Sequence, residues 1–191
     1  MQTVIGVYHV EENREKLVDF VIENYGVPKS LMLELPTYWQ ELDYFKKTYF
    51  YFLADRFKAR GTRIVAGDRE SDLVVPKSFC EKIQELESKK SVLRKFFWLK
   101  YFAHEIRKNL SNTKVDRLRN ISFLEAFEEE NPELTIVGDD HARFIKDFCP
   151  GVEYVHFRSN TPLEDKLFYK KNSSEFIIKP DREVVVDVKW Q

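Results

Sequence analysis

Near its start the chain carries TVIGVYH at residues 3–9, an apolar stretch rich in β-branched side chains that ends in a histidine. A later stretch, LTIVGDDH at residues 134–141, again places a histidine three residues after a glycine at the end of an apolar run. Short runs of this composition are typical of buried strands, and glycine there would let the backbone turn tightly. The two stretches therefore predict two buried strands that each end in a turn carrying an imidazole.

Working outward, three more apolar runs predict further strands, at residues 31–35, 62–66 and 152–157. Apolar side chains at three- and four-residue spacing predict helices, at residues 13–25, 36–60, 76–87, 91–109 and 115–130, and in a short segment ending at residue 148. Asn13 is expected to cap the first helix. Strands that alternate with helices build βα units, so the predicted fold class is α/β, with an open, mainly parallel, Rossmann-like sheet.

A length of 191 residues suits a single domain that spans residues 1–191. Residues from about 76 to 130 are predicted to be helical with no strand among them, which indicates a helical insertion that caps one end of the sheet. Two apolar runs at residues 176–178 and 184–188 flank the stretch KPDR. They predict a C-terminal β-hairpin at about residues 174–190.

The composition, with 43% hydrophobic and 33% charged residues, is typical of soluble globular proteins. A net charge of −1 argues against nucleic acid as a partner of the whole chain. Residues 89–119 are locally basic and interleaved with aromatic rings, so they could face nucleic acid, an anionic membrane or an acidic substrate. The favoured explanation is that helices in this segment pack their rings on the core while their lysine side chains extend into water. The predicted 36–60 helix carries aromatic rings on more than one face, which indicates burial on two sides. Such a helix could cover a site or form a homodimer contact.

The two cysteines lie far apart in the sequence, which suits free thiols in a reducing compartment. No apolar run approaches the roughly 20 residues that a membrane span needs. The first residues do not resemble a signal peptide. We therefore expect a cytoplasmic protein with no membrane span.

The most informative polar residues lie where the predicted strands end. His9, Glu34 and His141 each follow or close a different apolar run, and Asp68 and Arg69 follow another. In an open parallel sheet, ligands bind beyond the carboxyl ends of the strands, so we expect these side chains at one edge. Two imidazoles and a carboxylate fit a divalent metal ion with open positions, and Asp68 is a further candidate ligand.

Several roles stay open for these residues. Glu34 could be a metal ligand or a general base, or it could form a structural ion pair with Arg69 or Arg119. Arg69 could hold a substrate carboxylate or a developing oxyanion, and Asp68 could simply cap a turn. Without a metal, the same groups could perform acid–base chemistry on their own.

Three other polar residues near predicted strand ends have simpler explanations. Asp139 and Asp140 are expected to cap the helix that follows them. His156 is favoured as a structural residue over an additional metal ligand, because one strand-end histidine alone says little.

Five short motifs also occur in an order that resembles a known family. They are GVYHV at residues 6–10, LEL at 33–35, GDR at 67–69, RN at 119–120 and GDDH at 138–141. With these motifs in this order, the chain resembles the TraB/PrgY family, within the wider erythromycin esterase, ChaN-like and Tiki superfamily. The resemblance covers roughly residues 4–145.

The resemblance implies a Rossmann-like core with a helical insertion and, by likeness to the Tiki members, metal-dependent peptidase chemistry. The TraB and PrgY members are linked to shutting down peptide pheromone signals. Carried over to this chain, the resemblance implies a metal centre of His9, Glu34 and His141. It implies Arg69 and Arg119 as supporting cations, and Asn120 as an orienting group beside Arg119.

The function predicted from residues and resemblance together is that of a metal-dependent hydrolase, peptidase-like, acting on a peptide or small-molecule substrate. Manganese, cobalt and zinc are the candidate ions. The alternative is a non-catalytic module that binds a peptide, an anion or a cofactor in the same cleft. In either case the two histidine-bearing turns must meet beside Glu34.

Overall fold

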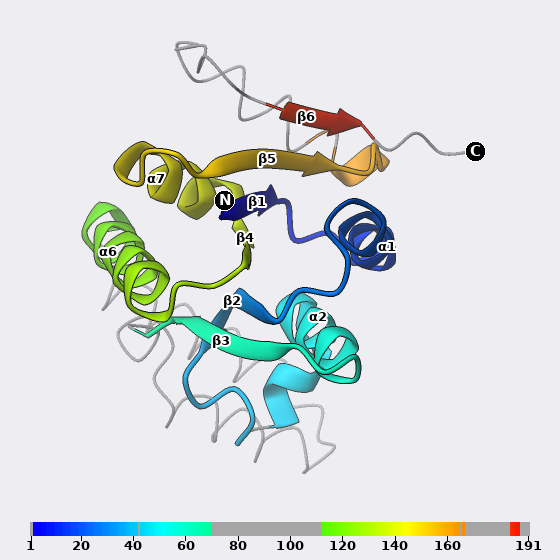
Figure 1. The fold of residues 1–191 in the computed structure, drawn as a ribbon, viewed down its shortest axis with the longest axis horizontal. Helices are drawn as coiled ribbons and strands as arrows, with labels where there is room; N and C mark the ends of the chain where they lie inside the picture. The colour runs from blue at the N-terminus through cyan, green and yellow to red at the C-terminus, as the bar shows by residue number, and fades with distance from the viewer. Residues whose placement is uncertain (1, 42, 70–111, 165, 167–183, 188–191) are drawn as a thin grey trace, which may run out of the picture.

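The computed structural model of the chain describes residues 2–41, 43–69, 112–164, 166 and 184–187. Its centre is a six-stranded sheet in the order β3-β2-β4-β1-β5-β6, in which every neighbouring pair is parallel (Figure 1). The predicted α/β fold with an open parallel sheet is therefore confirmed. The strands are β1 (Thr3–Val7), β2 (Ser30–Pro36), β3 (Arg63–Asp68), β4 (Leu134–Gly138), β5 (Glu153–Arg158) and β6 (Val184–Asp187).

Helices cover both faces of the sheet. Figure 1 shows α1 (Arg14–Tyr25) and α2 (Tyr49–Lys58) on one side, and α6 (Asn112–Glu130) and α7 (Asp139–Phe148) on the other. A sheet covered on both faces explains why β1, β2 and β4 are largely apolar and do not alternate with polar residues. All five residues of β1 are buried.

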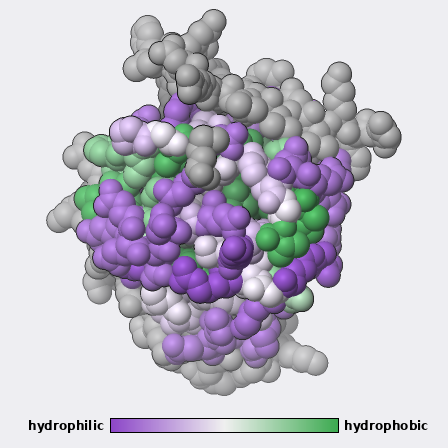
Figure 2. Space-filling model, in the orientation of Figure 1, coloured by the Kyte–Doolittle hydropathy of each residue, from purple (hydrophilic) through white to green (hydrophobic). Residues whose placement is uncertain are grey.

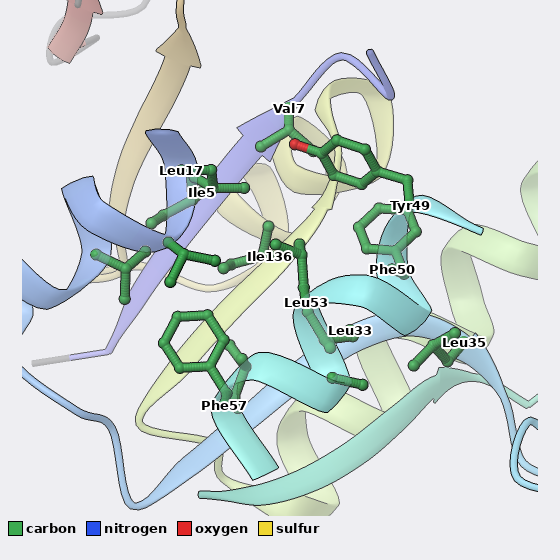
Figure 3. Packing of buried hydrophobic residues seen from close by; sticks show 14 of the residues in the cluster. Ile5, Val7, Leu17, Leu33, Leu35, Tyr49, Phe50, Leu53, Phe57 and Ile136 are labelled. Atoms are coloured by element: carbon green, nitrogen blue, oxygen red, sulfur yellow. The ribbon is translucent and has the colours of Figure 1, made fainter. Parts of the chain in front are cut away.

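Successive side chains along each inner strand point to opposite faces and so belong to two separate cores. Ile5 packs against α1 and α2, whereas its neighbour Val4 packs against α6 and α7. In β2, Leu33 and Met32 divide in the same way. Figure 3 shows the core on the α1 and α2 side, with Tyr49 and Phe50 near Val7 and Phe57 at the other end.

The predicted helix at residues 36–60 is wrong as a single element. Pro36 is still part of β2, turns follow it, a 3-10 helix occupies Asp43–Lys47, and α2 begins only at Tyr49. Thr48 separates the two helices because its backbone is extended and its hydroxyl accepts the Tyr51 N–H at 3.4 Å. A residue whose side chain accepts a backbone N–H in this way is the N-cap of the helix that follows it. A new helix therefore begins after Thr48, and the 3-10 helix before it does not extend into α2.

The helix predicted at residues 13–25 is confirmed as α1, but its cap differs from the expected one. Asn13 occupies the N-cap position without a capping hydrogen bond from its side chain. Its side-chain amide instead donates to the carbonyl of Tyr8 at 3.2 Å and to Glu164 at 2.9 Å. Its amide oxygen accepts the Tyr49 hydroxyl at 2.6 Å. Asn13 therefore joins three segments of the chain beneath the carboxyl end of β1.

Part of the predicted insertion and hairpin lies outside the described residues. The helix predicted at residues 115–130 is observed as α6, which begins three residues earlier, whereas the segments 76–87, 91–109 and 176–178 are among those not described. Of the predicted hairpin, the structure describes β6, which pairs in parallel with β5 in the register Val155↔Val184. The hairpin itself stays a prediction.

The aromatic residues of the 36–60 segment are largely accounted for by the chain's own core, in which Tyr38, Trp39, Phe45 and Phe57 are buried. On the face shown in Figure 2, hydrophilic residues predominate and apolar atoms form small, separate patches. The homodimer contact stays a prediction. None of the helices that the structure describes combines the length and hydrophobicity needed to cross a membrane.

We expect that Phe57→Ala will lower the free energy of unfolding by about 3–5 kcal/mol, because the ring is fully buried and its loss leaves a cavity. Urea or guanidinium denaturation followed by circular dichroism measures this change. The matched control is Ile121→Ala, on α6 with 46% of the residue exposed, for which we expect a change within about 0.5 kcal/mol. Equal losses in both variants would contradict the core described here.

Candidate functional site

The order of the strands places a crevice between β1 and β4. These two strands are neighbours, yet the chain leaves β1 through α1 on one face and leaves β4 through α7 on the other. In open α/β sheets such a switch in direction leaves a crevice beyond the carboxyl ends of the strands, and ligands bind there. His9 follows β1 and His141 follows β4, so the fold delivers both histidines to this crevice.

A pocket of about 380 Å³ occupies the crevice. It is lined by residues from the ends of β1, β2 and β4 and from α6 and α7, namely Val7, Tyr8, His9, Glu34, Arg119, Gly138, Asp139, Asp140 and His141. A larger pocket of about 820 Å³ opens near Gln2 and Val152, where β1 and β5 begin. It contains none of the predicted site residues, so the smaller pocket is the candidate site.

Glu34 lies between the two histidines. Its Oε2 is 3.4 Å from Nε2 of His9, and its Oε1 is 3.7 Å from Nε2 of His141. The carboxylate reaches this position because β2 pairs with β4 only as far as Leu33, and its pairing with β3 shifts register between Leu33 and Pro36. The irregular end of β2 thus frees Glu34 from the regular sheet.

Gly138 shows how closely the three side chains approach one another. A Cβ atom added to Gly138 would lie 3.0 Å from Oε2 of Glu34, 3.1 Å from Nε2 of His9 and 3.6 Å from Cδ2 of His141. One point at the end of β4 is therefore in contact distance of both imidazoles and the carboxylate. The structure brings together the two histidine-bearing turns and Glu34, which are far apart in the sequence.

The glycines of the two GxxH stretches have a different role from the one expected. Neither adopts positive φ: the glycines that do are Gly26, Gly61 and Gly151. Gly138 leaves room for Glu34 and His9, and a Cβ on Gly6 would lie only 2.6 Å from Oδ1 of Asp139. Both positions therefore exclude a side chain for lack of space and not for the sake of a tight turn.

The Glu34 carboxylate is ionised and held in place by two donors. Arg119 donates from Nη2 to Oε1 at 2.6 Å, and the backbone N–H of Gly138 donates to Oε2 at 2.9 Å. Burial by itself would raise the pKa of Glu34, but His9, Arg119 and His141 outweigh it and hold the pKa well below its usual range.

His141 is buried, and the side chain of Asn120 contacts its ring. Burial lowers the pKa of His141 below its ordinary value, which favours the neutral ring. Its Nδ1 lies 2.6 Å from the amide oxygen of Asn120. Because that oxygen can only accept, the proton of the neutral ring resides on Nδ1 and the lone pair of Nε2 faces Glu34. The ring of Phe123 packs against the imidazole, with centroids 4.5 Å apart.

His9 stands at the open side of the pocket, with 43% of its side chain exposed. Two rings at the start of α2 hold it: Tyr49 stacks on it with centroids 5.8 Å apart, and Phe50 meets it edge to face at 4.6 Å. The Tyr49 hydroxyl is in turn fixed by Asn13. The two imidazoles therefore differ, because one is buried and held by an amide and the other is open and held by rings.

Of the two predicted supporting cations, Arg119 reaches the site and Arg69 does not. Arg119 also donates to Oδ2 of Asp68, from Nε at 3.1 Å and from Nη2 at 2.7 Å. Asp68 therefore holds Arg119 and is not among the residues that line the pocket. The guanidinium of Arg69 pairs with Glu129 and, at 3.3 Å, with Glu130 on α6.

The expected helix-capping role of Asp139 is wrong. Gly138 is the N-cap residue of α7 and Asp139 is its first residue, buried and bonded to Tyr154, His156 and Arg143. His156 is fully buried and does not line the pocket. Tyr154 and His156 lie two residues apart on one strand, so their side chains point to the same face. This spacing in the sequence could have indicated that the two side chains act together. Tyr8 and Asp140 also line the pocket without having been singled out as site residues.

The donors around Glu34 match a divalent metal ion in type and in their separate distances from Glu34. Two ligands each 2.0–2.1 Å from a tetrahedral zinc ion are separated by about 3.4 Å, which compares with 3.4 and 3.7 Å here. His141 has the orienting partner on Nδ1 that metal-binding histidines usually have. Within the described part of the chain, no group of three or more His, Cys, Asp or Glu side chains is arranged so that it could hold a metal ion. The residues therefore fit an ion only by chemistry and by pairwise distance from Glu34.

We expect Arg119→Met to lower the free energy of unfolding by on the order of 3 kcal/mol, because it leaves the carboxylates of Glu34 and Asp68 buried without their common partner. Denaturant unfolding measures this loss. The control is Arg56→Met, which breaks an exposed ion pair with Glu15 and is expected to change stability by less than about 1 kcal/mol. If the two variants were equally stable, Arg119 would not be the anchor described here.

Asn120→Ala is expected to release the tautomer of His141, since no acceptor would then hold the proton on Nδ1. Ring ¹⁵N chemical shifts measured by NMR should change from those of a dominant Nδ1–H form to those of a mixture. Asn24→Ala on α1, where the side chain bonds only to the carbonyl of Phe20, should leave the His141 signals unchanged. A His141 tautomer unaffected by loss of Asn120 would refute this assignment.

The site described here rests on the chain's own residues. The lining of the pocket comes from four separate stretches, and only the fold brings them together. The resemblance to the TraB/PrgY family stays a prediction. Comparison of the chain with models of protein families, with curated proteins and with solved structures finds no match in any of the three.

Proposed function

We propose that this chain is a metal-dependent hydrolase that acts on a peptide or another small substrate, with a divalent ion held by His9, Glu34 and His141. The observation that carries the proposal is the pairing of His141 with Glu34. Nε2 of its imidazole lies 3.7 Å from an oxygen of the ionised carboxylate, and its Nδ1 lies 2.6 Å from the amide oxygen of Asn120. Two electron-rich atoms face each other favourably only when a cation or a shared proton lies between them.

The charge of the pocket supports a cation in preference to an anion. Three carboxylates, those of Glu34, Asp139 and Asp140, line it against the single guanidinium of Arg119. The two imidazoles add nitrogen donors, which are common ligands of zinc, cobalt and manganese in mixed sites. A phosphate or similar anion would meet net repulsion from this lining.

A bound ion would polarise a substrate carbonyl and lower the pKa of a water molecule. The protein's own groups have separate tasks. Asn120 keeps the Nε2 of His141 free of a proton, and Arg119 and the N–H of Gly138 keep Glu34 charged and fixed in orientation. Arg119 also lines the pocket, so its positive charge is available to stabilise an oxyanion that develops on the substrate.

The size of the pocket limits the substrate. A volume of about 380 Å³ holds a small molecule or a short piece of peptide around the bond to be cleaved. The open side at His9 allows the rest of a longer substrate to extend outward. This geometry supports a peptide or a small ester or amide over a large folded substrate.

A non-catalytic binding module is the second candidate. Both oxygens of Glu34 already accept a strong hydrogen bond, one from Arg119 and one from Gly138. A carboxylate held this firmly suits a fixed binding site as well as it suits a metal ligand. The two candidates make different predictions once the site is loaded.

We expect protein freed of metal with a chelator to bind one divalent ion per chain in calorimetric titrations with Zn²⁺, Co²⁺ or Mn²⁺. His9→Ala and His141→Ala should each weaken that binding at least about tenfold, because each removes one of three ligands. Glu130→Gln is the control, since that carboxylate pairs with Arg63 and Arg69 and does not line the pocket. Absence of binding for all three ions, or equal binding by all variants, would refute the metal centre.

Turnover separates the two candidates. The loaded protein is incubated with a mixture of short peptides, and products are detected by mass spectrometry. If the chain is a hydrolase, the unaltered protein cleaves a peptide and Glu34→Gln does not. The Glu130→Gln control then cleaves it at the same level as the unaltered protein. Saturable binding of a peptide without cleavage would favour the binding module instead.

A further inference from the structure

Asp139, which lines the pocket, is also the centre of a second group of polar residues whose hydrogen bonds the proposed chemistry does not use. The group consists of Asp139, Arg143, Tyr154 and His156, which we call the Asp139 cluster. Asp139, Tyr154 and His156 are buried, and His156 is completely inaccessible. Polar groups in such a position must be held by hydrogen bonds, because unpaired burial is costly.

The Asp139 carboxylate is the centre of this cluster. Its Oδ1 accepts hydrogen bonds from the Tyr154 hydroxyl and, at 2.8 Å, from Nδ1 of His156. Its Oδ2 accepts from Nε of Arg143 at 3.0 Å, one turn along α7. The donors come from β5 and from α7, so the carboxylate ties the start of the helix to the neighbouring strand.

The cluster also packs directly against the backbone of the central strand. Oδ1 of Asp139 is 2.6 Å from the point where a Cβ of Gly6 would lie, and Ala142 is 3.2 Å from the same point. The first turn of α7 therefore sits on β1 without an intervening side chain. Tyr8, which lines the pocket, meets the ring of His156 edge to face at 5.4 Å.

Asp139 is joined to the site through the chain itself. Gly138, the preceding residue, donates its N–H to Glu34, and His141 lies two residues further along the same helical turn. Any rotation of the turn at residues 138–141 would move the donor of Glu34 and the ring of His141 together. The cluster holds this turn through the side chain of Asp139.

We propose that Asp139 is a positioning residue, which through Tyr154 and His156 fixes the turn at residues 138–141 so that Gly138 and His141 keep their geometry at Glu34. Its effect on ion binding rests on the proposed function, whereas its effect on the Gly138–Glu34 hydrogen bond does not. Apolar packing alone could hold α7 to the sheet. A carboxylate that accepts hydrogen bonds from three donors does more than hold the helix, because it also fixes one orientation of the turn.

The test compares Asp139→Asn and Tyr154→Phe with the unaltered chain by amide hydrogen exchange measured by NMR. The Gly138 amide reports directly on its bond to Glu34, and the amide of Ile136, two residues earlier in β4, reports on the sheet. We expect protection of Gly138 to fall at least about tenfold in both variants, while protection of Ile136 changes less than about twofold. Tyr154→Phe keeps the ring and its packing, so it stays informative if Asp139→Asn disturbs the fold.

Tyr25→Phe is the matched control, because the Tyr25 hydroxyl bonds to Glu153 outside the cluster. It should leave Gly138 unchanged. If Gly138 and Ile136 lose protection in equal measure, or if neither changes, Asp139 has only a general structural role and the inference is overturned.

A parallel titration with Zn²⁺ separates this inference from the proposed function. Weaker zinc binding in Asp139→Asn and Tyr154→Phe, by about tenfold, supports both. If the unaltered chain binds no zinc while Gly138 loses protection as expected, the metal centre fails and the positioning role of Asp139 stands.

Discussion

The ionised carboxylate of Glu34 is the interaction on which the arrangement of the site depends. It is largely removed from water, so its charge must be balanced locally, and the guanidinium of Arg119 does this. Arg119 is itself held by Asp68, so the balance extends from β2 through α6 to β3. The N–H of Gly138 adds a donor from β4. One buried charge therefore links three strands and a helix that are distant in the sequence.

The sheet topology explains why that charge lies beside two imidazoles. Neighbouring strands β1 and β4 send their helices to opposite faces, so the ends of both strands stay uncovered at the point where they meet. The irregular end of β2 admits Glu34 to the same opening. Burial then makes the histidines unequal: His141 is enclosed and has a fixed tautomer, whereas His9 faces the open side.

Most of the fold and the centre of the site could be predicted from the sequence, because both depend on local patterns. Apolar β-branched runs identify buried strands, and residues just beyond them meet at one edge. What failed depends on side-chain direction and on packing between distant segments. Asp68 ends β3 and Arg69 follows it, and both pair with α6. Asp68 pairs with Arg119, whereas Arg69 pairs with Glu129 and Glu130 at the far end of that helix, away from the site. Similarly, a single hydroxyl at Thr48 divides a segment whose apolar spacing indicates one helix.

The close approach of Gly6 to the Asp139 carboxylate has a consequence for how sequences of this type can diverge. A methyl group at position 6 and a carboxylate at position 139 cannot occupy the same volume. Replacement of Gly6 by alanine is therefore compatible only with a shorter residue at 139 or with a displaced helix. The two positions are expected to covary among related chains, so that a residue other than glycine at position 6 marks a chain in which the first turn of α7 has been rebuilt.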